Sequence, residues 1–99
     1  MTSVLIIDDE PDVGRAIARV MTRAGYSARV AETAEAGIAM QVQDPSDVVI
    51  TDIIMPKQHG ISVIEALRRQ SPATRIVAIS GGGNFEQQEY QPHAITTTA

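Results

Sequence analysis

Short apolar runs recur along the chain and predict β-strands. Residues 4–7 and 76–79 are continuous apolar runs, residues 48–50 form a third run, and residues 27–31 form a weaker one. Uninterrupted runs of this length, above all the first, are typical of strands buried on both faces. We therefore expect four strands.

The segment after the first run has the period of an amphipathic helix. Asp9 or Glu10 can cap it, Pro11 suits its first turn, and Gly25 ends it. The apolar face predicted for this helix consists of Val13, Ile17, Val20, Met21 and Ala24. Such a face must pack against a flat apolar surface, which the predicted strands can supply.

Two further segments have the same helical period. Thr33 is placed to cap the second helix, which ends before Pro45. A loop over residues 53–59 leads to Gly60, where the third helix starts, and this helix ends before Pro72. Their apolar positions are Ala34, Ile38 and Val42 in the second helix, and Ile61, Ile64 and Leu67 in the third.

Strands and helices alternate, which is the pattern of an α/β fold: a doubly wound parallel sheet with helices on both faces. In such sheets ligands bind beyond the carboxyl ends of the strands, where the winding reverses. Polar residues follow three of the predicted strands: Asp8 and Asp9, Asp52, and Ser80. We expect the chemistry of the protein to lie at that edge.

Composition excludes several classes of function. The 99 residues carry twelve acidic and eight basic side chains, for a net charge of -4, so a surface that binds nucleic acid directly is not expected. The chain contains no cysteine, which excludes disulfides and thiolate metal sites. No signal peptide or membrane span is indicated, so a cytoplasmic location is expected.

The aspartates predict a metal site and a phosphoryl acceptor. Converging carboxylates repel one another, and a divalent cation relieves this repulsion. Oxygen ligands without cysteine favour a hard ion, and a small set of carboxylates with water and phosphate suits Mg²⁺. Asp52 is the candidate nucleophile for a phosphoryl group, and the hydroxyl of Ser80 could then bond a phosphoryl oxygen.

These motifs together resemble the receiver domain of two-component response regulators. The resemblance rests on the segments "VLIIDDEPDV", "VVITDIIMPKQHG" and "IVAISGGG". It implies a flavodoxin-like sheet with strand order 2-1-3-4-5, of which the fifth strand is not expected within these residues. It also implies phosphorylation by a histidine kinase or a histidine phosphotransfer protein, followed by a change in a protein-binding face.

The resemblance also implies a role for each site residue. Asp9, Asp52 and the backbone carbonyl of Ile54 would coordinate Mg²⁺, and Asp8 would act through a metal-bound water. Asp52 would be the phosphoacceptor, and Ser80 would sense the phosphate. Three residues, Met55, Pro56 and Gly60, are interpreted as shaping the loop after Asp52 rather than as reacting.

The C-terminal segment departs from the family pattern. We expect residues 1–80 to form the receiver core and residues 81–99 a glycine-rich loop and polar tail, with Asn84 or one of residues 96–98 as a helix cap. Receivers have a lysine after a fifth strand, and residues 81–99 contain no lysine. The strand at 76–79 would then be an exposed edge, completed by further chain, by a partner or by strand exchange.

The sequence leaves three classes of function open. The first is a phosphoacceptor switch that is not an enzyme in its own right. The second is a binding module that works without phosphate. The third is an aspartate-nucleophile phosphatase, which normally needs a second Asp two residues after the nucleophile, where this chain has Ile54. We place the switch first, with a downstream protein or an attached output region as its target.

Overall fold

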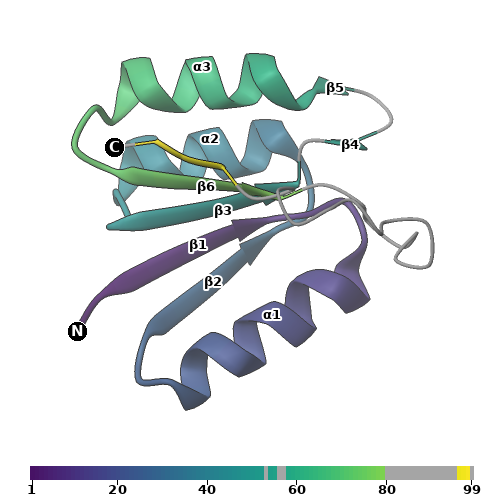
Figure 1. Ribbon diagram of the computed structural model, residues 1–99, viewed down its shortest axis with the longest axis vertical. Coiled ribbons are helices and arrows are strands. Elements are labelled where there is room, and N and C mark those ends of the chain that lie inside the picture. The colour runs from purple at the N-terminus through teal and green to yellow at the C-terminus, as the bar shows by residue number, and fades with distance from the viewer. Residues whose placement is uncertain (53, 56–57, 80–95, 99) are drawn as a thin grey trace.

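The computed structural model describes residues 1–52, 54–55, 58–79 and 96–98 and shows a sheet with helices on both faces (Figure 1). The helix α1 covers one face, and α2 and α3 lie together on the other (Figure 1). This confirms the predicted fold class. The elements are β1 (Ser3–Ile7), α1 (Pro11–Arg23), β2 (Ser27–Ala31), α2 (Ala34–Gln43), β3 (Val48–Asp52), β4 (Ile54–Met55), β5 (Gln58–His59), α3 (Gly60–Gln70), β6 (Arg75–Ile79) and β7 (Thr96–Thr98).

The main sheet has the order β2-β1-β3-β6-β7. Its first four strands are parallel and correspond to the four predicted strands, so the predicted order 2-1-3-4 is confirmed. The strand β3 is longer than predicted, because Thr51 and Asp52 continue the pairing with β6. The chain winds in opposite directions from β1 and β3, and a ligand site is expected between the ends of these two strands.

Two segments predicted to be loops contain short strands. Within residues 53–59, β4 and β5 pair antiparallel, with Ile54 opposite His59. In the tail, Thr96–Thr98 pair antiparallel with β6, so these threonines are not helix caps and the edge at Ile76–Ala78 is paired. β-Branched threonines favour an extended backbone, but an edge partner decides whether they form a strand. Asn84 lies outside the described residues.

The side chains of the sheet are more completely buried on the face that packs against α2 and α3 than on the opposite face. In β1, Leu5 and Ile7 face these helices and Val4 and Ile6 face α1, and all four are buried. In β3 and β6 the two faces differ. Val49, Ile76 and Ala78 on the α2 and α3 side are buried, and the residues on the opposite face of the sheet are half-buried: Val48, Ile50, Val77 and Ile79.

The helix ends follow the sequence signals. The α1 helix ends at Arg23, and Gly25 has a φ of +100°, a left-handed conformation that glycine adopts without strain. Thr33 caps α2 by accepting a hydrogen bond from the Ala36 N–H at 3.0 Å. Within the described ranges, no helix combines the length and the apolar character that crossing a membrane requires.

The predicted faces of α1 and α2 are confirmed in part. The predicted positions that are buried or half-buried are Val13, Ile17, Met21, Ala34 and Ile38. Val20 is 59% exposed and Val42 is 56% exposed, although both were expected to face the sheet. Instead Gly14 is the buried residue of α1, and Gly37 is buried in α2. A residue without a side chain allows the helix backbone to lie close to the sheet at these two positions.

A buried polar network fixes the edge of the sheet at which β3 and β6 begin. The Gln41 side chain is fully buried in α2, and its Oε1 accepts a hydrogen bond from the Ser46 N–H at 2.9 Å. Its Nε2 donates to the Ser46 carbonyl at 3.1 Å and to the Thr74 Oγ1 at 2.9 Å. Ser46 precedes β3 and Thr74 precedes β6, so one side chain ties together the starts of two core strands.

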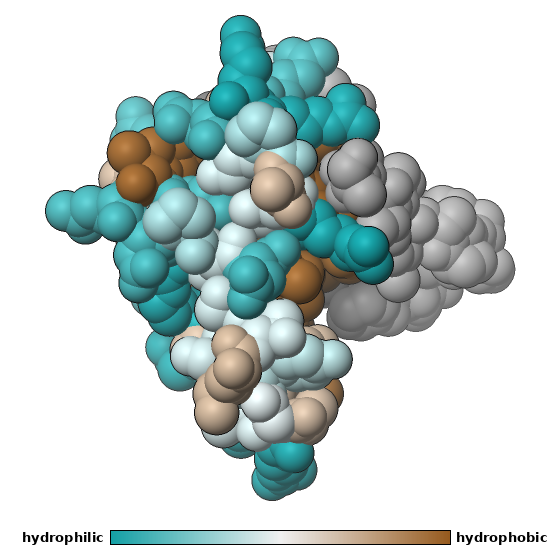
Figure 2. Space-filling model, turned by 90° about the vertical axis from the view of Figure 1, so that its left-hand side faces the viewer, coloured by the Kyte–Doolittle hydropathy of each residue, from teal (hydrophilic) through white to brown (hydrophobic). Residues whose placement is uncertain are grey.

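Figure 2 views the molecule from the side on which the strands begin. Much of this surface is hydrophilic or intermediate in hydropathy, with separate hydrophobic patches (Figure 2). The Gln41 network lies behind this surface, because α2 ends and β3 and β6 begin there. The carboxyl ends of the strands, with their aspartates, lie at the opposite edge of the sheet (Figure 1).

We predict that Gln41→Leu destabilises the protein by about 2–3 kcal/mol, because it leaves the buried Ser46 N–H and its neighbours without their partner. Urea unfolding followed by circular dichroism measures the change. Gln43→Leu, at an exposed position of the same helix, is the matched control and should change stability by less than about 0.5 kcal/mol. Equal stability of the two variants would contradict this account of the network.

Candidate functional site

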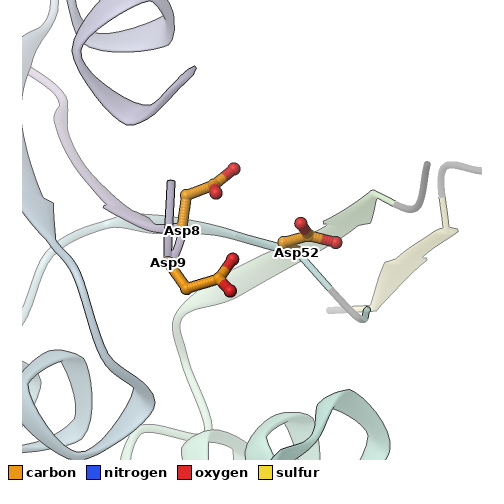
Figure 3. Close-up of side chains that lie close together, drawn as sticks. All are labelled: Asp8, Asp9 and Asp52. Atoms are coloured by element: carbon orange, nitrogen blue, oxygen red, sulfur yellow. The ribbon is translucent and has the colours of Figure 1, made fainter. Parts of the chain in front are cut away.

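Three carboxylates meet at the carboxyl edge of the sheet. Asp8 and Asp9 directly follow β1, and Asp52 is the last residue of β3. These strands pair in parallel with Ile7 opposite Thr51, so the next residue of each strand is an aspartate. Asp8, Asp9 and Asp52 each offer one oxygen, and these oxygens all lie within 4.8 Å of one another. Figure 3 shows the carboxylates of Asp8 and Asp9 on the side of β1 that faces Asp52.

The environment of the Asp8 carboxylate opposes its charge. Asp8 and Asp52 are each 2% exposed, and Asp9 is half-buried. Burial raises the pKa of Asp8 above its ordinary value, a hydrogen bond from the Glu10 N–H lowers it in part, and the charge of Asp9 raises it further. A cation between these groups would remove both the desolvation cost and the repulsion.

Asp8 makes the side-chain hydrogen bond that supports the start of α1. Glu10 occupies the N-cap position but makes no side-chain capping hydrogen bond, so the expected cap by Asp9 or Glu10 is wrong in this respect. Instead the Asp8 Oδ1 accepts a hydrogen bond from the Glu10 N–H at 2.9 Å. An aspartate that bonds the amide two residues ahead forms a local turn, which leads the chain from β1 into the helix.

The structure describes only some of the other predicted site residues. Ile54 and Met55 form β4, which follows Asp52 by one residue. Gly60 is the first residue of α3, at the position where the third helix was predicted to start. Pro56 and Ser80 lie outside the described residues.

Sequence reasoning missed the part that Gly14 plays beside this site. A Cβ atom at Gly14 would lie 2.9 Å from the Val30 Cγ1 and 3.8 Å from the Asp8 Cβ. The signal that could have found it is glycine in the middle of an amphipathic helix, which lowers helix propensity and therefore often has a packing reason.

Comparison with known proteins identifies the family of this chain. The sequence matches the family model of the response regulator receiver domain over residues 4–97. The chain belongs to the response-regulator receiver family. Its place in this family makes it a signalling domain of two-component systems, and its relatives are response regulators rather than conventional enzymes.

Individual relatives support the assignment. The nitrogen assimilation regulatory protein NtrX of Azorhizobium caulinodans is 33% identical over 85 residues, which cover 84% of this chain and 19% of NtrX. The chain therefore spans about a fifth of the length of that relative. A receiver domain from Clostridium thermocellum superposes with a TM-score of 0.77 at 25% identity, covering 87% of this chain and 70% of that one.

One further neighbour is described with ligands. The response regulator TrrA of Thermotoga maritima, solved in complex with Mg²⁺ and BeF, has a TM-score of 0.77 at 24% identity. The match covers 95% of this chain and 81% of TrrA. At this identity the likeness establishes that the two chains share a fold.

We predict that Asp8→Asn makes the metal-free receiver more stable at neutral pH. The pKa of Asp8 is raised in the folded protein, so ionisation of this group opposes folding. Its contribution to stability therefore increases as the pH falls from neutral through the folded pKa, and it levels off below the unfolded value of 3.8. The asparagine oxygen can still accept the Glu10 N–H.

Thermal unfolding in a chelator, followed from neutral pH to about pH 4, tests this. The difference between the wild type and Asp8→Asn should shrink as the pH falls. Asp12→Asn is the control, because the Asp12 side chain is 96% exposed and pairs only at the surface with Arg15. A variant less stable than the wild type at neutral pH would contradict the argument.

Proposed function

We propose that this receiver is a Mg²⁺-dependent phosphoacceptor and that Asp52 is the residue phosphorylated. The observation that carries the proposal is the convergence of the Asp8, Asp9 and Asp52 oxygens at one edge of the sheet. In such a site one carboxylate can act as nucleophile while the others hold a cation near the transferring group. Asp52 is our choice as nucleophile because it alone comes from β3, opposite the acidic pair.

The donor set of the site fits Mg²⁺. All three side chains offer carboxylate oxygens, the ligands that hard divalent cations prefer. We assign Asp9, Asp52 and the Ile54 carbonyl as direct ligands and Asp8 as a ligand through water. When bound, Mg²⁺ would neutralise charge that develops on the phosphoryl oxygens. The Mg²⁺ in the TrrA complex belongs to that protein, so the assignment here rests on these three carboxylates.

The proposed transfer needs a phosphohistidine donor. An Asp52 oxygen forms a bond to phosphorus, the bond from phosphorus to the donor's histidine nitrogen breaks, and that nitrogen takes up a proton. A histidine kinase or a histidine phosphotransfer protein in the cytoplasm would supply this group. We further propose that the Ser80 hydroxyl then bonds the phosphoryl group and that a protein-binding face changes in response. The target is a downstream protein or an output region of the full-length regulator.

We predict that a small phosphodonor labels the wild-type protein in Mg²⁺ and that Asp52→Asn is not labelled. The reason is that an amide nitrogen or oxygen cannot replace the carboxylate as a nucleophile for phosphorus. Intact-mass spectrometry of the unquenched reaction would detect one added phosphoryl group. A chelator should abolish the labelling.

Asp47→Asn is the matched control for this experiment. Asp47 lies just before β3, at the opposite end of the strand from Asp52, and accepts hydrogen bonds from the Ser3 N–H and hydroxyl. Its removal should leave labelling unchanged. A wild-type protein that binds Mg²⁺ but takes no phosphoryl group would instead favour the phosphate-independent binding module.

A further inference from the structure

The backbone of Gly14 lies unusually close to the sheet beside the acidic site. It is the buried residue of α1, and an added Cβ would come within 2.9 Å of the Val30 Cγ1 in β2. Such a separation is shorter than carbon atoms tolerate, so any side chain here would displace the helix or the valine. The absence of a side chain thus sets how close the first turns of α1 lie to β2.

Hydrogen bonds link this contact to the acidic pair. The Gly14 N–H donates to the Glu10 carbonyl at 3.1 Å, and the Glu10 N–H donates to the Asp8 Oδ1 at 2.9 Å. The Asp8 N–H in turn donates to the Ala31 carbonyl at 3.0 Å. These hydrogen bonds connect the first turn of α1, the Asp8 carboxylate and the end of β2. A displacement of the helix would therefore move the carboxylate as well.

From this geometry we propose that Gly14 is a positioning residue for the divalent cation, an inference that rests on the proposed function. A methyl group at position 14 pushes α1 away from Val30, and Glu10 moves with the helix. The hydrogen bond to Asp8 then draws the acidic pair out of register with Asp52. Mg²⁺ demands nearly ideal octahedral geometry, so a shift of a few tenths of an ångström at its ligands weakens binding.

The effect on the metal can be separated from an effect on folding. Alanine has a higher helix propensity than glycine, and this gain offsets part of the packing cost in Gly14→Ala. If Gly14→Ala only destabilised the fold, weaker metal binding would be accompanied by a clear loss of stability in urea unfolding. A positioning role instead predicts weaker metal binding in a protein whose unfolding transition is little changed.

The test is a titration of the whole chain with Mn²⁺, an ion that takes similar oxygen ligands, monitored by electron paramagnetic resonance. The wild type should bind one ion at the acidic site. Gly14→Ala should weaken binding by roughly tenfold, the scale seen when groups that support metal ligands are altered. Val30→Ala alone should bind like the wild type.

The double variant Gly14→Ala, Val30→Ala gives the decisive comparison. It removes the Cγ1 atom that the new methyl group meets, so α1 can return and affinity should recover toward that of the wild type. Gly37→Ala is the control for crowding of a buried helical glycine in general: its Cβ would overlap the Ile7 Cδ1 and lie 2.6 Å from the Cγ1, on the other face of the sheet. Urea unfolding confirms that each variant is folded.

Three outcomes would overturn the inference about Gly14: normal binding by Gly14→Ala, no recovery in the double variant, or an equal loss in Gly37→Ala. Each of these leaves metal binding by the wild type intact, and so leaves the proposed function standing. Absence of Mn²⁺ binding by the wild type would instead overturn the proposed function, and the role of Gly14 with it.

Discussion

The parallel pairing of β1 with β3 is the constraint on which the rest of the site depends. The register that places Leu5 beside Val49 and Ile7 beside Thr51 buries the centre of the core. The same register places Asp8 and Asp9 next to Asp52, because each strand continues directly into its aspartate. Leu5, Ile7 and Val49 are buried in this register, so the pairing that forms the core also brings the like charges together.

Two helices are hydrogen-bonded to the ends of the strands, one at each edge of the sheet. At the edge where the strands begin, Gln41 ties the starts of β3 and β6 through Ser46 and Thr74. At the carboxyl edge, the first turn of α1 is tied to Asp8 through the Glu10 N–H. The fold is therefore secured on one side by a satisfied polar network. On the other side it brings together charges that a cation would neutralise.

The sequence predicted the strands and the acidic cluster well because both follow from local pattern. Short continuous apolar runs such as residues 4–7 and 76–79 are typical of buried strands. The position of each aspartate after its strand follows directly from the order of residues in the chain. The faces of α1 and α2 were predicted less well, since periodicity counts apolar side chains and ignores glycine. Gly14 and Gly37 are buried against the sheet, whereas Val20 and Val42 are exposed. The strand at Thr96–Thr98 depends on pairing with β6, which no local pattern encodes.

The proposed site requires that Asp9 and Asp52 are ligands of one divalent cation at the ends of β1 and β3. Anomalous diffraction from a crystal of this chain grown with Mn²⁺ would test it most directly. We expect one ion within about 2–2.5 Å of an oxygen from each of these two carboxylates, the range of oxygen ligands to hard cations. An ion bound elsewhere, with Asp9 and Asp52 outside its coordination sphere, would show that these two aspartates are not the metal ligands.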